Sequence, residues 1–263
     1  MAETRASGRL PSLYVGSGAQ HYHELACHDD TEITSVLSYL KDLPDAALAG
    51  RRVLELACGS GRVTLPMAAA GHRVLATDLS TDMLSILAKR LAEPRARRSE
   101  IADRIEIQQA DMVSFDVQEL FKAVCLSTAS ITLLDSEQRR GALRCIVAHL
   151  AIGGAFIVST DHVLPEAPTT NTVWLRPDMC LIEEIDHVGR RRRTVLRCGG
   201  EEYVSELHLV TPENLANDLR EVGFTLTAQR SSADPTLPHH ANVVLGAVYR
   251  RRPERSTTKR SSP

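Results

Sequence analysis

Apolar residues recur at two different spacings along the chain, and the alternation of these spacings predicts an α/β fold. Compact apolar runs typical of buried strands alternate with segments in which apolar residues lie three or four positions apart, as on one face of a helix. Strands are predicted within residues 53–56, 71–80, 104–112, 121–127 and 150–158. Helices are predicted at residues 33–43, 63–70, 81–91 and 136–150. This order of elements indicates a parallel sheet with helices on both faces.

The rhythm changes after residue 161. Residues 162–172 are rich in Pro and Thr, and short β-like runs separated by turn residues follow. These runs lie at residues 172–175, 179–188, 193–198 and 202–210. Strand and hairpin patterning of this kind predicts an antiparallel insertion of about 40 residues.

A helix and two more strands are predicted after this insertion. Thr211 fits a helix cap and Pro212 the first helical position, so a helix begins there and ends at Gly223. Strands at residues 224–230 and 242–249 then complete the sheet.

The first strand leads into a turn of small residues, with the sequence VLELACGSGR over residues 53–62. Gly59 and Gly61 lack the Cβ atoms that would keep a ligand away from the backbone. The turn also precedes a helix N-terminus, where free N–H groups favour a carboxylate or phosphate. The nicotinamide pattern G-x-G-x-x-G requires a third glycine where this chain has Thr64. Glu55, four residues before Gly59, gives a different pattern, acidic-x-x-x-G-x-G.

This pattern resembles the first motif of the class I S-adenosylmethionine (SAM) methyltransferases. The likeness continues in order through Asp78 at the end of the second strand, Asp111 after the third, and the fourth and fifth strands. The resemblance implies a doubly wound, Rossmann-like, seven-stranded sheet with an antiparallel β insertion after strand five. In that family the last two strands form an antiparallel hairpin at one edge of the sheet.

The same resemblance assigns roles to individual residues. Asp78 would accept hydrogen bonds from both ribose hydroxyls, Asp111 would bind the exocyclic amine of adenine, and Met112 would meet the ring edge with its backbone. Tyr22 lies in a segment that folds over bound SAM in such enzymes, although packing of the N-terminus on the core explains this tyrosine equally well. The expected cofactor contacts are Glu55, Ala57, Gly59, Gly61, Asp78, Leu79, Met83, Asp111, Met112, Ser127 and Tyr22.

The resemblance also implies a division of the chain. The chain is expected to consist of an N-terminal lid segment and helix (1–45), a SAM-binding core (46–161), the antiparallel insertion over the substrate site (162–210), the C-terminal part of the core (211–250) and a disordered basic tail (251–263).

Composition narrows the class of protein but does not indicate a reaction. The formal net charge of −2 argues against a nucleic-acid surface over the whole molecule. No apolar run approaches membrane-spanning length, and the N-terminus has no signal-peptide core, so we expect a cytoplasmic protein. A metal site is not expected, because the His21, His23, Cys27 and His28 cluster has no second cluster at zinc-site spacing.

The acceptor is expected above the C-terminal ends of the strands. The candidates for a base or substrate contact are His162, directly after strand five, His239 and His240 between the last two strands, and Tyr22. A neutral amine needs no base, whereas a hydroxyl acceptor benefits from one. Residues 22 and 55 and the segment 128–134 resemble natural-product methyltransferases that N-methylate daptide-type peptides. We therefore expect methyl transfer from SAM to an amine of a small-molecule or peptide natural product.

Other functions remain open at this stage. The acceptor could be an oxygen or a carbon of a secondary metabolite, or the chain could bind SAM without catalysis. An NAD(P)-linked oxidoreductase is opposed by Thr64 and by the lack of a Tyr-x-x-x-Lys pair.

Overall fold

The computed structural model describes residues 12–27, 30, 32–43, 50–93, 100–234, 237 and 239–249 of the chain. The expected disordered tail at 251–263 and the first eleven residues of the expected lid lie outside the described residues. The described helices are α1 (Ser17–Ala26), α2 (Ile33–Lys41), α4 (Thr64–Ala69), α5 (Thr81–Ala92), α7 (Ser136–His149) and α8 (Pro212–Glu221), with 3-10 turns η1 (Ala102–Arg104) and η2 (Ser130–Leu133). None of them is both long and apolar enough to cross a membrane.

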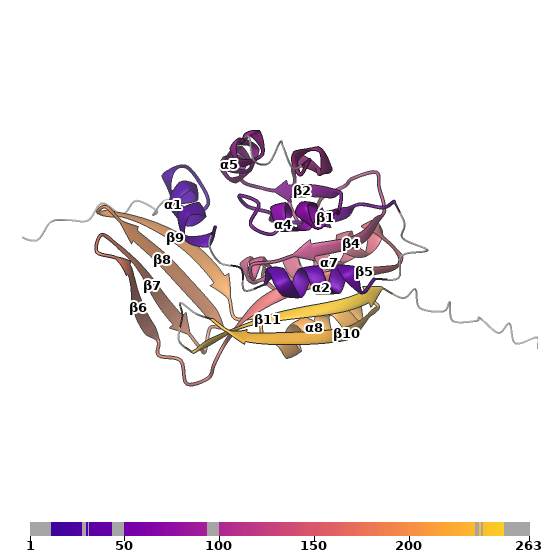
Figure 1. Ribbon diagram of the computed structural model, residues 1–263. Helices are drawn as coiled ribbons and strands as arrows, with labels where there is room; N and C mark the ends of the chain where they lie inside the picture. Colours follow the sequence, from indigo (N-terminus) through magenta and orange to yellow (C-terminus); the bar gives the residue numbers. More distant parts are fainter. Residues whose placement is uncertain are drawn as a thin grey trace, which may run out of the picture.

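A seven-stranded sheet forms the centre of the molecule (Figure 1). In spatial order its strands are β10 (Phe224–Ala233), β11 (His240–Tyr249), β5 (Leu150–Val163), β4 (Phe121–Leu126), β1 (Val53–Glu55), β2 (Val74–Asp78) and β3 (Ile105–Gln109). Strands β1 to β5 are parallel, whereas β10 and β11 form an antiparallel hairpin beside β5. The predicted doubly wound sheet is therefore confirmed.

The order of the strands places the loops that follow β1 and β4 next to each other. From β1 the chain passes to β2 on one side, and later returns to β4 on the other side. At such a switch the two loops separate above the C-terminal ends of the strands, which is where ligands bind in open α/β sheets.

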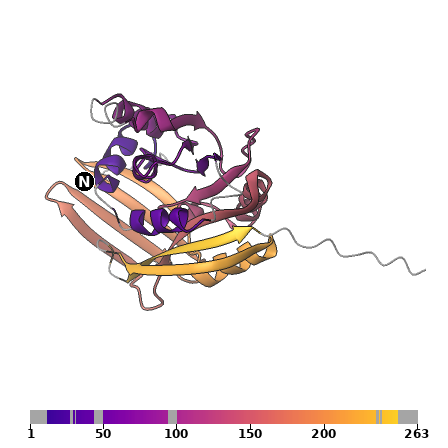
Figure 2. The same cartoon turned by 45° about the vertical axis from the view of Figure 1, so that its right-hand side comes forward.

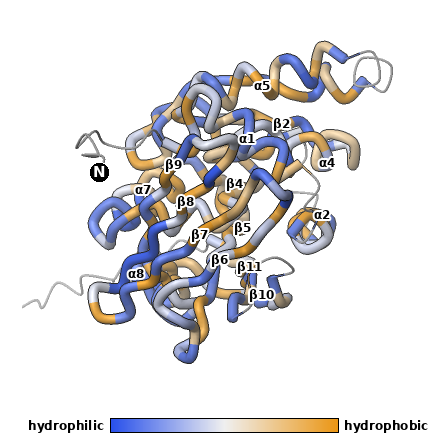
Figure 3. Tube along the Cα trace, turned by 90° about the vertical axis from the view of Figure 1, so that its left-hand side faces the viewer, coloured by the Kyte–Doolittle hydropathy of each residue, from blue (hydrophilic) through white to orange (hydrophobic). Residues whose placement is uncertain are grey.

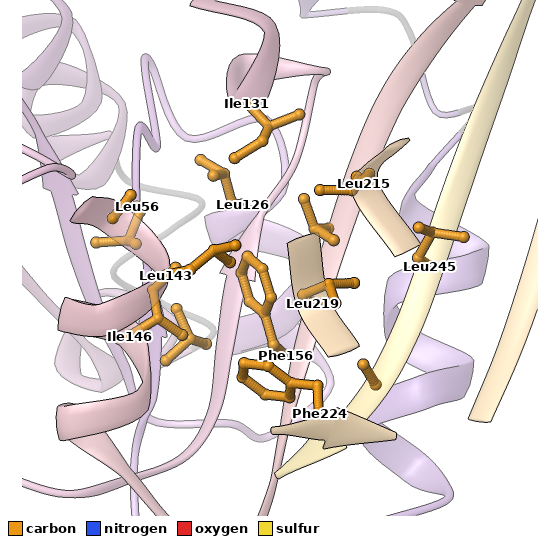
Figure 4. Packing of buried hydrophobic residues seen from close by; sticks show 14 of the residues in the cluster. Leu56, Leu126, Ile131, Leu143, Ile146, Phe156, Leu215, Leu219, Phe224 and Leu245 are labelled. Carbon is orange, nitrogen blue, oxygen red and sulfur yellow. The ribbon is translucent and has the colours of Figure 1, made fainter. Parts of the chain in front are cut away.

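Apolar residues pack on both faces of this sheet because its central strands are buried on both sides. On one face, Phe156 of β5 and Phe224 of β10 pack with Leu143 of α7 and Leu219 of α8 (Figure 4). On the other face, residues of α2, α4 and α5 pack against β1, β2 and β4. The sheet is thus held rigidly enough to fix the positions of its loops.

The insertion after β5 is a separate four-stranded antiparallel sheet, as the sequence predicted. Its strands are β6 (Thr170–Arg176), β7 (Met179–Asp186), β8 (Arg191–Cys198) and β9 (Glu201–His208). Its strands carry both hydrophobic and hydrophilic residues (Figure 3), and more and less exposed residues alternate along β6 and most of β9, so the sheet has two different faces. It lies beside the main sheet and next to α1 (Figures 1 and 2).

Strand β5 extends further than the sequence predicted, to Val163 instead of residue 158. The additional residues pair with the start of β11, where Asp161 lies opposite Asn242 and Val163 opposite His240. The hydrophobic pattern stops at 158 because residues 159–162 are themselves polar, although they continue the ladder with β11.

Candidate active site

The turn after β1 has the backbone that the sequence pattern requires. Ala57, Gly59 and Gly61 all have positive φ angles, of 51°, 54° and 85°. A Cβ on Gly61 would lie 2.4 Å from the side chain of Leu87, whereas one on Gly59 would meet nothing within 4 Å. Gly61 is therefore needed for packing, and Gly59 leaves open space above the turn.

Asp78 at the end of β2 is joined to this turn. Its carboxylate accepts hydrogen bonds from the backbone N–H of Gly59 and of Ser80, each 2.8 Å long. Burial raises the pKa of Asp78, although these backbone hydrogen bonds act in the opposite direction. Leu79 beside it is 64% exposed, so the chain next to this carboxylate remains accessible.

Glu55, the acid of the motif, is buried and accepts a hydrogen bond from the hydroxyl of Thr64. Burial raises its pKa to about 8, against a lowering effect of Thr64 and Arg62. The guanidinium of Arg62 also donates to Glu32 at 3.2 Å.

The remaining expected cofactor residues lie around the same edge. Met83 is buried in α5 and packs with Ala19 of α1. Asp111 follows β3, is exposed, and accepts a hydrogen bond from the N–H of Val113 at 2.9 Å. Met112 is half-buried and packs on the main core.

The N-terminal segment lies between the turn region and the insertion. The rings of Tyr14 and Tyr22 meet edge to face with centroids 5.2 Å apart, and both pack against Met83 and its neighbours. The Tyr14 hydroxyl shares a hydrogen bond with Ser205 of β9, and its carbonyl accepts one from Ser80. Tyr22 is half-buried in α1, a helix that the sequence analysis did not predict.

The loop after β4, which lies at the strand-order switch opposite the turn after β1, has unusual backbone angles. Thr128 and Ala129 follow the buried Ser127 and have φ angles of 58° and 52°, which non-glycine residues rarely adopt. The N–H of Thr128 donates to Glu32 at 2.7 Å, and that of Ala129 to Ser159 at 2.8 Å. These bonds hold the strained loop in place.

Glu32 is a functional candidate that sequence reasoning missed. It directly precedes α2 in the sequence. In the structure its side chain makes no cap, is 1% exposed and also accepts a hydrogen bond from Asn242 at 2.6 Å. Glu32 thus connects α2, the turn after β1, the loop after β4 and β11. The sequence shows Glu32 only as a charged residue before an apolar helix. It does not indicate these contacts, because the three residues that donate to Glu32 are far apart in sequence.

The three histidine candidates do not form one site. His162 and Val163 are neighbours on β5, and His240 pairs with Val163, so His162 and His240 point to opposite faces of the ladder. His239 is exposed and has a φ of 68°. The sequence predicted that these residues lie near one another, but it could not predict on which face of the sheet each side chain lies.

His240 is part of a buried ion cluster with Asp161, Glu183 and Arg192. Its Nε2 donates to Glu183 at 2.9 Å, and its Nδ1 lies 3.5 Å from Asp161 and 3.1 Å from Arg192. Burial lowers the pKa of His240, but the carboxylates of Asp161 and Glu183 outweigh burial and raise it to about 9. Burial likewise raises the pKa of Asp161, but Arg192 and His240 hold it well below its usual range. A protonated, enclosed imidazole cannot accept a proton at neutral pH, so His240 is corrected from a candidate base to an ion-pair partner.

No group of three or more His, Cys, Asp or Glu side chains suited to a metal ion occurs within the described ranges. In the cluster around His240, the carboxylates of Asp161 and Glu183 pair with Arg192.

The family model described as a methyltransferase domain matches residues 53–154. Demethylmenaquinone methyltransferase of Clavibacter sepedonicus is 34% identical over 202 residues, 75% of each chain. Cypemycin N-terminal methyltransferase of a Streptomyces species is 34% identical over 116 residues, which are 43% of this chain and only 44% of that protein. The solved structure of the glycopeptide N-methyltransferase MtfA with SAM superposes with a TM-score of 0.61 at 27% identity, covering 84% of this chain and 95% of that one.

The geometry of the turn fits SAM, which carries a sulfonium and an ammonium group. Gly59 leaves the space above the backbone open, and the carboxyls of Glu55 and Asp78 lie beside it. Asp78 can accept hydrogen bonds from a ligand there, and a cationic ligand would favour the ionised forms of both acids. The match along the chain, the strand order and this turn lead to one conclusion: the chain belongs to the SAM-dependent methyltransferases.

Proposed function

We propose that the chain transfers the methyl group of SAM to an amine nitrogen of a small-molecule or peptide natural product. The observation that carries this proposal is the lack of a suitable base in the ion cluster beside the switch. His240 is protonated and enclosed there, and Asp161 is bound to Arg192. A neutral amine has its own lone pair and needs no base. The glycopeptide N-methyltransferase MtfA and the cypemycin N-terminal methyltransferase support the same acceptor by their names.

In this proposal the donor is bound by the residues around the turn after β1. Bound SAM supplies a methyl group that is already activated by its sulfonium. Asp78 would accept hydrogen bonds from the ribose hydroxyls, and Asp111 and Met112 would hold the adenine. Glu55 and the backbone of Ala57, Gly59 and Gly61 would complete the donor site, with Leu79, Met83 and Ser127 along its walls.

The protein's contribution to the reaction is alignment and exclusion of water. Orienting two bound reactants supplies about 7–11 kcal/mol of a barrier by effective-molarity arguments. Tyr22 and Tyr14 are proposed to close the donor site from the N-terminal side, since they pack between Met83 and the insertion. Residues 162–210 are proposed to cover the acceptor. The strained loop at Thr128 and Ala129, held by Glu32, would fix the direction from which the acceptor approaches.

Transfer from labelled SAM to matched acceptors tests this function. We expect label in a peptide with a free N-terminus and in an amino sugar, and none in the N-acetylated form of each. Label in demethylmenaquinone but in neither amine would replace the proposal by methylation of that acceptor, which is the one in the name of the Clavibacter relative.

A further inference from the structure

One row of polar side chains crosses all four strands of the insertion. Asn171 of β6 lies opposite Glu183 of β7, Glu183 opposite Thr194 of β8, and Thr194 opposite Ser205 of β9. Directly opposed residues in antiparallel strands share a face of the sheet. The four side chains therefore form a continuous polar row on one face, which we call the inner row.

The inner row faces the main sheet and the N-terminal segment. Glu183 is bonded to His240 at the start of β11, and Ser205 to the hydroxyl of Tyr14. The carbonyl of Tyr14 is in turn bonded to Ser80, two residues after Asp78. The row thus extends from the end of the β5–β11 ladder to the N-terminal segment that contacts Ser80.

Two members of the row have hydrogen-bonding groups that the protein does not use. The Nδ2 atom of Asn171 is buried and has no hydrogen-bond partner. Thr194 is half-buried, and its hydroxyl has no partner within the part of the chain that the structure describes. A buried donor without a partner costs free energy, which a ligand group can recover.

The charges next to the row are already balanced. The carboxylates of Glu183 and Asp161 are matched by the guanidinium of Arg192 and the imidazolium of His240. A charged group of a ligand would therefore find no free counter-charge in this cluster, whereas a neutral hydroxyl or amide group would find two free partners. Val173 and Leu181, which lie opposite each other in the neighbouring row and are half-buried, offer apolar surface for the carbon skeleton of such a ligand.

We propose that Asn171 and Thr194 determine acceptor specificity by binding neutral hydroxyl or amide groups of the methyl acceptor. The acceptor is then an amine that carries several such groups, of which an amino sugar is the simplest representative. This inference rests on the proposed amine methylation and adds to it the chemistry that surrounds the reacting nitrogen.

The test uses the full chain saturated with S-adenosylhomocysteine and calorimetric titration with two sugars. The probes are glucosamine and a trideoxy analogue that keeps the amine and the ring but lacks the other ring hydroxyls. The variants Asn171→Leu and Thr194→Val each remove a hydrogen-bonding group and nearly keep the shape. Thr172→Val is the matched control, because Thr172 lies one position along β6 on the opposite, exposed face.

We expect glucosamine to bind more tightly than its analogue. Asn171→Leu and Thr194→Val should each weaken glucosamine binding on the order of fivefold, the effect of one neutral hydrogen bond, without changing S-adenosylhomocysteine affinity. The analogue and the Thr172→Val control should show no such change. Equal affinity for the two sugars, unchanged binding in both inner-row variants, a similar loss in the control, or no saturable binding of either sugar would each overturn the inference.

Methyl transfer to glucosamine is measured in parallel and separates the two proposals. Binding with the expected sensitivity but without transfer would refute amine methylation and leave the inner row as the acceptor surface. Transfer that Asn171→Leu and Thr194→Val leave unchanged would support the proposed function and refute the inference.

Discussion

The carboxyl of Glu55 illustrates how burial changes a residue within an otherwise apolar strand. It is 2% exposed, and burial raises its pKa from the ordinary value of 4.5 to about 8. At neutral pH the cofactor-free chain thus keeps this acid protonated, with Thr64 donating to it. A cationic ligand nearby favours the ionised form, so SAM affinity should rise with pH up to that value.

The stability of the cofactor-free chain should depend on pH through Glu55. Between pH 4.5 and about 8 the unfolded chain has lost this proton while the folded chain retains it. The free energy of unfolding should therefore fall as pH rises through this window, by about 1.4 kcal/mol per pH unit. Urea unfolding at several pH values should show a flatter dependence for Glu55→Gln than for the wild type. The exposed Glu137→Gln serves as control, and parallel curves for Glu55→Gln and wild type would contradict the prediction.

Asp78 should contribute directly to SAM binding. Asp78→Ala removes an acceptor of hydrogen bonds, and each bond to a charged group is worth about 1.5–3 kcal/mol before water compensates. We expect calorimetry to show at least about a tenfold loss of SAM affinity. Asp103→Ala, at an exposed residue of η1, should bind SAM like the wild type. Equal affinity in Asp78→Ala would remove this residue from the proposed donor site.

At the scale of elements, the insertion is joined to the main sheet through charge as well as apolar packing. Arg192 of β8 contacts Asp161 of β5 and Glu183 of β7, and all three side chains are at most 12% exposed. The arginine thus bridges the two sheets at a place that water does not screen well.

Removing this buried arginine should destabilise the protein far more than removing its neighbour. Arg192→Ala leaves two buried carboxylates with only His240, a loss of about 3–5 kcal/mol. Arg193→Ala breaks exposed pairs with Glu184 and Glu206 and should cost about 1 kcal/mol or less. Urea unfolding of both variants tests the difference, and similar midpoints would show that the cluster does not hold the insertion.

For the whole molecule, the proposed amine chemistry has a characteristic pH dependence. A protonated amine has no lone pair, so the acid limb of the rate profile should follow the pKa of the acceptor and shift when the acceptor is changed. His162→Ala should reduce the rate only modestly, because a base is not required. A loss on the order of 10²–10⁴ in His162→Ala or His239→Ala, with SAM affinity intact, would instead indicate a hydroxyl acceptor and a histidine base.

The sequence was sufficient for features that depend on local spacing. The apolar runs predicted the strands, Thr211 and Pro212 the start of α8, and Gly59 and Gly61 the tight turn after β1. These predictions hold because a strand, a cap or a positive φ angle depends on residues within a few positions of one another. The order of motifs then identified the family, since each motif lies at the end of a successive strand.

Only the tertiary structure decided which distant residues meet. Glu32 receives donors from positions 62, 128 and 242, and His240 lies between carboxylates of two different sheets. The inner row depends on the register of β6 to β9, and a shift of one residue would turn Asn171 and Thr194 to the outer face. Long-range contacts of this kind set how buried a side chain is, what its pKa is and which face of a sheet it lies on. The sequence therefore determined the donor-binding fold. The tertiary structure decided which polar groups remain free for the acceptor.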